Sequence, residues 1–253
     1  MFHIKNNIAA GLALVILFTA SAAFAKSLKQ EAPKEKTATA ATSATAASAP
    51  VSAPVKDGVE LADDSAEAIK LRSAPGDPVA GKTKAELCTG CHGEEGISIE
   101  GLAPKLAGQY GKYIAKQLRN FQSGTRTHQI MSAIAATISD DDLADIAAYF
   151  ASRPKMKGNG SDNKLGKELF LHGDMSRMMV ACVNCHGANG KGKSPVNSVF
   201  PVIGGQQKDY LRGQLINFRA GDRSNSPGGI MNIITQKLTD AELEALADYV
   251  SGL

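Results

Sequence analysis

The 253-residue sequence contains no tryptophan, and aromatic residues make up only 5% of it. A core built from side chains alone would therefore have few large rings, unless a bound cofactor supplied one. The 28 basic residues barely exceed the 25 acidic ones, and nothing in the sequence indicates the clustered basic face of a nucleic-acid-binding protein. Runs of period-two alternation are also missing. The sequence therefore predicts an all-α protein that does not bind nucleic acid.

Cysteine is scarce as well, and every cysteine belongs to one of two copies of the motif C-x-x-C-H. This spacing is the attachment signature of c-type haem, because two thiols three residues apart can each form a thioether to one porphyrin. The adjacent histidine then lies under the iron as its proximal ligand. The sequence therefore predicts two covalently bound haem c groups. The residues concerned are Cys88, Cys91, His92, Cys182, Cys185 and His186.

Two other uses of paired cysteines are open at this point. A zinc site would need both pairs to converge on one ion, but the pairs lie 94 residues apart and each has its own histidine. A thioredoxin-like redox pair is expected in a β–α–β setting, which the sequence does not indicate. Both interpretations are weaker than haem attachment.

Residues 1–25 have the pattern of a secretory signal peptide. Lys5 gives a basic start, an apolar run covers 8–18, and an Ala-Phe-Ala cleavage site ends at Ala25. Cleavage there would release the mature protein into the bacterial periplasm, an oxidising compartment. In the alternative, the segment stays uncut and anchors the protein at the periplasmic face of the membrane.

The rest of the chain is a linker followed by a repeat. Residues 26–75 are rich in Ala, Thr, Ser and Pro, which predicts a flexible linker with a short helix within 59–72. Two copies of one unit follow, predicted as domains at 76–153 and 164–253 with a polar join over 154–163. The numbering shift between the copies is 94 at the first cysteine, then 97, then 100 near the end. Two three-residue insertions explain these steps, so the copies are a duplicated domain.

Helices are predicted from apolar spacing in both copies. They cover 110–123 and 140–151 in the first copy and 240–250 in the second. Thr239 and Glu242, three residues later, form a capping box at the start of the last helix.

A haem iron bound by one histidine has a sixth position to fill. Among seven methionines, only Met131 and Met231 occupy equivalent positions in the two copies. Their thioethers are therefore predicted as the sixth ligands, a ligation that raises the reduction potential. The alternative is that each methionine only fills space in a core. His128 and His172 have no counterpart in the other copy and are expected to be surface or loop residues.

Matched residues also suggest how each haem is held. A ligating histidine needs an acceptor for its other ring N–H, and the carbonyls of Pro104 and Pro201 are candidates. Four further matched residues could hydrogen-bond the haem propionates, although solvation of the arginines and packing of the tyrosines would also explain them. These residues are Tyr113, Arg126, Tyr210 and Arg223.

After each C-x-x-C-H motif the same series follows: Pro, Gly-Gln, Tyr, Gln-Leu, Phe-x-x-Gly-x-Arg and Met. Across residues 80–253 this pattern resembles the dihaem cytochrome c4 family. The resemblance implies two tandem class I cytochrome c domains related by a pseudo-two-fold axis, with His92/Met131 and His186/Met231 as axial pairs. It also implies an electron carrier, not an enzyme. Such a carrier passes electrons in a respiratory chain from a donor such as a quinol-oxidising complex toward a terminal oxidase.

Two other functions are open from the sequence. One is a cytochrome subunit bound to a dehydrogenase, which the sequence does not distinguish from a free carrier. The other is a dihaem peroxidase, in which one iron must open its sixth position to peroxide. Methionine at both matched positions argues against the peroxidase.

Overall fold

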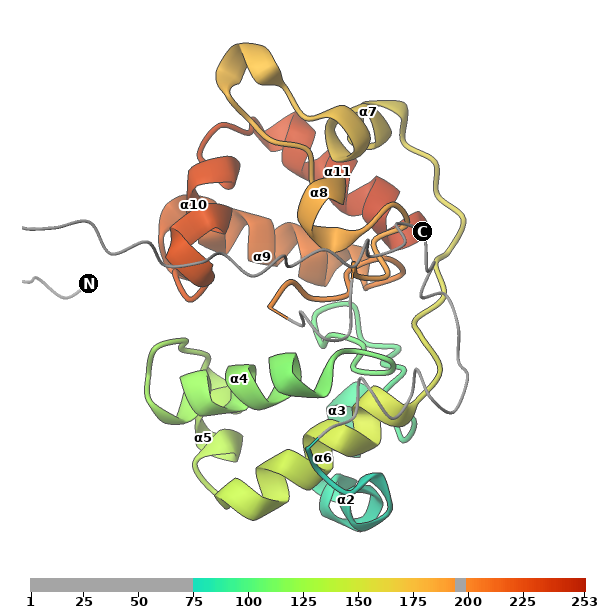
Figure 1. The fold of residues 1–253 in the computed structure, drawn as a ribbon, viewed down its shortest axis with the longest axis vertical. Helices are drawn as coiled ribbons and strands as arrows, with labels where there is room; N and C mark the ends of the chain where they lie inside the picture. The colour runs from blue at the N-terminus through green and yellow to red at the C-terminus, as the bar shows by residue number, and fades with distance from the viewer. Residues whose placement is uncertain (1–74, 194–198) are drawn as a thin grey trace, which may run out of the picture. The chain divides into compact units, whose positions relative to one another are not determined.

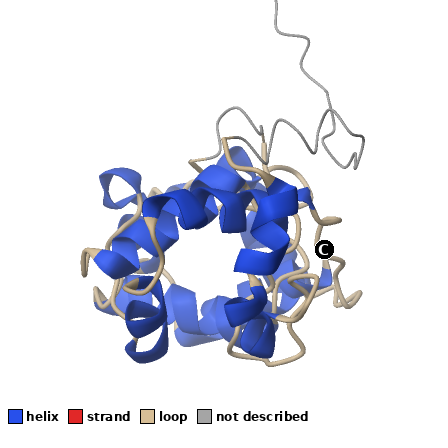
Figure 2. Cartoon of the chain, turned by 90° about the horizontal axis from the view of Figure 1, so that it is seen from below, coloured by secondary structure: helices blue, strands red, loops and turns tan. Residues whose placement is uncertain are grey.

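The computed structural model describes residues 75–193 and 199–253, and the fold is that of these two ranges. The predicted signal peptide and nearly all of the 26–75 linker, including the helix expected within 59–72, lie outside the described residues. Within the described ranges the regular elements are helices, and Figure 2 accordingly draws helices and loops. None of the described helices has the length and apolar character needed to cross a bilayer.

The first repeat is built on a helix that crosses the repeat's C-terminal helix (Figure 1). The helices are α2 (Pro78–Lys84), α3 (Glu86–His92), α4 (Gly111–Gln122), α5 (Gln129–Ala135) and α6 (Asp140–Ser152). α2 packs on α6, α6 also contacts α4, and α4 contacts α5. The helices predicted over 110–123 and 140–151 correspond to α4 and α6.

The second repeat has the same order of helices with two short 3₁₀ turns added. Its elements are α7 (Lys164–His172), η1 (Met175–Arg177), α8 (Val183–His186), α9 (Lys208–Ala220), η2 (Pro227–Gly229), α10 (Ile230–Thr235) and α11 (Asp240–Gly252). α7 packs on α11, and α9 contacts both α10 and α11. The predicted capping box is present: Thr239 accepts from the Glu242 N–H, and the Glu242 carboxylate accepts from the Thr239 N–H at 2.8 Å.

Each repeat has its own apolar core, and a third cluster joins the repeats. The first core surrounds Phe150 and the second surrounds Phe170. The third consists of Tyr110, Met156 and Val202, so it contains a residue of the join at 154–163. Because only 1% of Met156 is exposed, this part of the join is packed against both repeats.

The repeats contact each other through equivalent residues used in both directions. The Gln109 amide donates to the Val202 carbonyl at 2.7 Å and accepts from the Val202 N–H at 2.9 Å. The Gln206 amide makes the same two bonds to Lys105, at 2.9 Å and 2.7 Å. The numbering shift of 97 relates the two glutamines and also relates Lys105 to Val202. Such reciprocal pairing is the property of a two-fold contact, the relation between the domains that the family resemblance implies.

Both helix crossings depend on a glycine. A Cβ added to Gly81 in α2 would lie 2.0 Å from the Asp145 carbonyl oxygen of α6, and one added to Gly166 in α7 would lie 2.0 Å from the Ala245 carbonyl oxygen of α11. These distances are far below van der Waals contact, so the helices can cross this closely only without a side chain.

We therefore expect Gly81→Ala and Gly166→Ala each to lower the free energy of unfolding by about 1–3 kcal/mol, the usual cost of overpacking. Gly213 is the matched control, because it lies in α9 with no atom within 4 Å of an added Cβ. Gly213→Ala should be neutral or stabilising by up to about 1 kcal/mol, since alanine has the higher helix propensity. Urea unfolding followed by circular dichroism measures all three, and equal midpoints would contradict the crossing argument.

Candidate haem-binding sites

The histidines of both C-x-x-C-H motifs are buried and bonded to a proline carbonyl. His92 ends α3, and its Nδ1 lies 2.8 Å from the Pro104 oxygen. His186 ends α8, and its Nδ1 lies 2.9 Å from the Pro201 oxygen. Donation from Nδ1 fixes the tautomer and leaves Nε2 as the ring nitrogen that can bind a metal. Both imidazoles are therefore prepared for ligation in the same way.

Burial lowers the pKa of both imidazoles, and the hydrogen bonds to the proline carbonyls only partly oppose this effect. A lowered pKa keeps the ring neutral near pH 7, which is the form that binds iron.

The cysteine pairs lie beside these histidines and are free thiols. Cys88 and Cys91 lie on one turn of α3, whereas Cys182 immediately precedes α8 and Cys185 lies within it. Burial raises the pKa of Cys88 and of Cys182 to about 11, so both remain protonated thiols at neutral pH. The pairs stay in separate repeats, and the described residues contain no group of three or more His, Cys, Asp or Glu that could hold a metal ion. The fold of the described residues therefore does not bring the two cysteine pairs together, as a zinc site would require.

The matched methionines lie in the first turn of the short helix that precedes each C-terminal helix. Met131 is in α5 and Met231 is in α10, and both are half-buried. Their backbone N–H groups donate to upstream side chains, Met131 to His128 Nδ1 at 3.3 Å and Met231 to Ser226 Oγ at 3.2 Å. His128 therefore caps α5. His172 is exposed and lies 4.0 Å from Glu168.

The four residues predicted to bind propionates meet across the contact between the repeats. Arg126 Nη2 donates to the Tyr210 hydroxyl at 3.2 Å, and Arg223 Nη2 donates to the Tyr113 hydroxyl at 3.0 Å. The arginine of each repeat is therefore bonded to the tyrosine of the other. Burial raises the pKa of Tyr210, but the two guanidinium groups lower it more strongly.

Positive charge accumulates in this cluster without a carboxylate. Lys116 joins the two arginines, and its ammonium is bonded to the Asn120 and Asn225 oxygens. None of the ion pairs among the described residues includes Lys116, Arg126 or Arg223. Arg223 is only 7% exposed, and its guanidinium donates to neutral side-chain oxygens of Asn225, Gln214, Gln117 and Tyr113, so an anion nearby would stabilise its charge further.

Haem propionates would supply that negative charge. Each repeat also provides two thiols and one imidazole with a free Nε2, which is the donor set of covalent haem c. The residues present therefore fit one haem in each repeat, with a shared cationic cluster between them.

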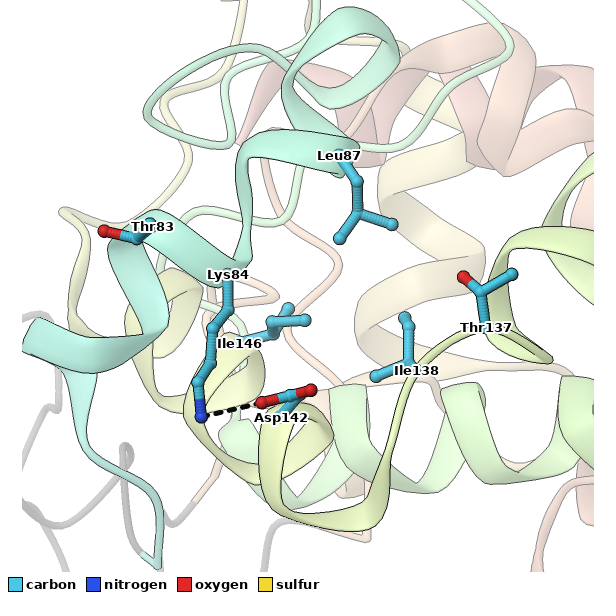
Figure 3. Close-up of a pocket in the computed structure, with 7 residues that line it drawn as sticks. All are labelled: Thr83, Lys84, Leu87, Thr137, Ile138, Asp142 and Ile146. Atoms are coloured by element: carbon cyan, nitrogen blue, oxygen red, sulfur yellow. Dashed lines mark ion pairs between the residues drawn. The ribbon is translucent and has the colours of Figure 1, made fainter.

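The surroundings of the two sites differ near the residue that precedes the first cysteine. In the first repeat, Leu87 of α3 points into a cleft of about 290 Å³ that is also lined by Thr137, Ile138 and Ile146 (Figure 3). An ion pair of 2.8 Å between Lys84 and Asp142 closes one side.

In the second repeat, additional chain packs against the counterparts of these lining residues. The shift between the crossing glycines is 85 and the shift between the first cysteines is 94, so nine extra residues lie between helix and motif. They fold into a small hairpin closed by the Asp174–Met179 bridge. Met179 is buried in the second core, and Arg177 pairs with Glu242, the counterpart of Asp142, at 2.7 Å.

Sequence reasoning missed this hairpin and the glutamine contacts. The hairpin could have been found by aligning Gly81 with Gly166, because both precede their motif on an equivalent helix. Gln109 and Gln206 belong to the matched Gly-Gln pair, but a repeated residue does not reveal that its partner lies in the other repeat.

Comparison with known proteins assigns both repeats to one family. The cytochrome c family matches residues 78–154 and again 164–253. Cytochrome c4 of Pseudomonas aeruginosa is 40% identical over 186 residues, which cover 72% of this chain and 92% of the relative. The thiosulfate dehydrogenase electron acceptor of Thiomonas intermedia is 31% identical, covering 71% and 84%. The crystal structure of reduced cytochrome c4 from Pseudomonas stutzeri superposes with a TM-score of 0.67 at 38% identity, covering 70% of this chain and 99% of that one.

The cationic cluster generates a prediction about redox potential. We expect Arg223→Gln to lower the midpoint potentials, because removing a buried positive charge disfavours the reduced state. The expected shift is on the order of 60 mV, or about 1.4 kcal/mol for one electron. Arg212→Gln is the control, since Arg212 is half-exposed and already pairs with Glu244. Spectroelectrochemical titration measures both variants, and equal potentials in wild type and Arg223→Gln would contradict the anion-binding role.

Proposed function

Because the chain belongs to the dihaem cytochrome c4 family, we propose that it carries electrons between proteins of a periplasmic respiratory chain. The donor is a quinol-oxidising complex or a similar redox protein, and the acceptor is a terminal oxidase. The protein is a carrier and does not itself transform a substrate. Bound haem supplies a reversible one-electron step at iron.

The chain's own residues have three tasks in this function. Cys88 and Cys91, and their counterparts Cys182 and Cys185, fasten one haem in each repeat. His92 and Met131, with their counterparts His186 and Met231, would bind the iron on its two faces. Tyr113, Arg126, Tyr210 and Arg223 would hydrogen-bond the propionates at the contact between the repeats, and the two arginines would also balance their charge.

One observation carries the proposal: the same imidazole arrangement occurs twice. In both repeats a buried histidine lies next to two free thiols. Its Nδ1–H donates a hydrogen bond to a proline carbonyl, which leaves its Nε2 available. A methionine at the matched position of each repeat would close the iron to small molecules. Only electrons would then be exchanged, which suits a carrier and not a peroxidase.

The predicted signal peptide at 1–25 supports export to the periplasm. If it were retained, the same carrier would operate tethered to the periplasmic face of the membrane. N-terminal sequencing of the mature protein distinguishes cleavage after Ala25 from retention.

A second candidate function is favoured by relatives that accept electrons from a dehydrogenase. The thiosulfate dehydrogenase electron acceptor is 31% identical to this chain. The protein would then serve as the cytochrome subunit of a dehydrogenase. Purification under mild conditions separates the candidates: a free monomer supports the mobile carrier, and a dehydrogenase subunit retained in stoichiometric amount supports the second function.

The carrier proposal is tested by counting haems and titrating them. Two covalently bound haems per chain and two reversible one-electron waves are expected. A colourless mature protein, rapid peroxide turnover, or ready binding of carbon monoxide to both haems would contradict the proposal.

The axial methionines are tested one at a time. Met131→Ala and Met231→Ala should each remove the methionine–iron charge-transfer band of one haem and lower its potential, since methionine ligation raises potential. Met175→Ala is the control, because that side chain is 74% exposed. A band of full strength in either axial variant would show that its methionine is not a ligand.

A further inference from the structure

Each candidate axial histidine is hydrogen-bonded to a peptide group that is itself bonded to a glutamine of the other repeat. The carbonyl of the Pro104–Lys105 peptide accepts from His92 Nδ1 at 2.8 Å. The N–H of the same peptide donates to Gln206 Oε1, in the other repeat, at 2.7 Å. One peptide group therefore links the histidine of the first repeat to a glutamine of the second.

The reverse connection is also present. The carbonyl of the Pro201–Val202 peptide accepts from His186 Nδ1 at 2.9 Å. Its N–H donates to Gln109 Oε1, in the first repeat, at 2.9 Å. Both histidines are thus connected to the opposite repeat by the same sequence of two hydrogen bonds.

The orientation of both glutamine amides is fixed by their surroundings. Gln206 Oε1 accepts a second N–H, from Gln207 at 2.9 Å, while its Nε2 donates to the Lys105 carbonyl. Gln109 Oε1 likewise accepts from the Tyr110 N–H at 3.1 Å, while its Nε2 donates to the Val202 carbonyl. A flipped amide would place donors against donors, so the acceptor atom faces the peptide N–H in both repeats.

Consecutive hydrogen bonds, such as those that join histidine, peptide and glutamine, polarise one another. When its N–H is bonded to an acceptor, a peptide group carries more negative charge on its carbonyl oxygen. That oxygen then attracts the imidazole proton more strongly, which makes the histidine a more basic ligand. Both glutamines are 5% exposed and both histidines are buried, so water does not replace or screen these bonds.

We propose that Gln206 and Gln109 are positioning residues, each of which tunes the axial histidine of the opposite repeat through one peptide group. A more basic axial histidine favours oxidised iron, so each glutamine holds the potential of the opposite haem below the value it would otherwise have. The potential of each haem then depends on docking of the other repeat. This inference rests on the proposed function, because it requires the two histidines to bind iron.

The test uses the full two-haem protein and follows each haem separately. Gln206→Leu removes the acceptor, and should raise the midpoint potential of the haem at Cys88 and Cys91 while leaving that of the second haem nearly unchanged. Gln109→Leu should do the reverse. The titration waves are assigned to their haems by the Met131→Ala and Met231→Ala variants.

A second substitution separates tuning from a loosened interface. Gln206→Glu keeps an oxygen that can accept from the Lys105 N–H but loses the amide donor. It should leave the first haem's potential at or below the wild-type value, opposite in sign to Gln206→Leu. Disruption of the interface alone would move the potential in the same direction in both variants, which would overturn the proposal.

Gln207→Leu is the matched control. Gln207 is the neighbouring glutamine and also donates across the contact, to the Ser98 carbonyl, without touching either proline peptide. The midpoint potentials of both haems in Gln207→Leu should equal those of the wild type. Proton NMR of the His92 Nδ1–H gives an independent readout, because weaker donation in Gln206→Leu should move this resonance upfield.

The outcomes distinguish this inference from the proposed function. A protein without two haems, or without histidine ligation, would contradict the carrier itself. Normal haem content with wild-type potentials in both leucine variants would overturn only the tuning through glutamine. A shift confined to the mutated residue's own repeat would overturn it as well.

Discussion

The hydrogen bond from each motif histidine to a proline carbonyl is the contact on which the rest of the protein depends. It orients the imidazole, fixes its tautomer and leaves Nε2 available for iron. The loop that carries each proline is held from the opposite repeat by Gln206 or Gln109. The two-fold contact therefore does more than join two domains. It supports the backbone on which each haem site is built, and a separated repeat would lose that support.

The duplication also explains why the repeats can share a cationic cluster. With equivalent residues on both sides of a pseudo-two-fold axis, the arginine of each repeat reaches the tyrosine of the other. Neutral oxygens of Gln117, Gln214 and Asn225 accept from these cations, and anions nearby would stabilise the concentrated charge further. Two haems whose propionates approach the same cluster would supply such anions, and the cluster would favour their reduction.

The symmetry is broken beside the first cysteine of each motif. The first repeat has a cleft lined by Leu87, the residue before Cys88, whereas the nine additional residues of the second repeat place Met179 and Arg177 against the counterparts of its lining residues. The surroundings of the two haem sites are therefore unequal although their ligand sets match. Unequal surroundings are one physical source of different potentials or different partners at the two ends of a relay.

The sequence by itself determined the helical class, the duplication and the candidate ligands, because these are local patterns. Periodicity marked α4, α6 and α11, and the spacing within C-x-x-C-H identified the cysteines and histidines. Residues matched between the repeats pointed to the prolines, tyrosines and arginines. Only the tertiary structure decided that the hairpin of the second repeat packs Met179 into that repeat's core. It also decided which residues meet across the repeats and that Met156 in the join is buried. Those contacts join residues about 50 to 110 positions apart. No spacing rule covers such separations, because only the packed fold determines which distant residues become neighbours.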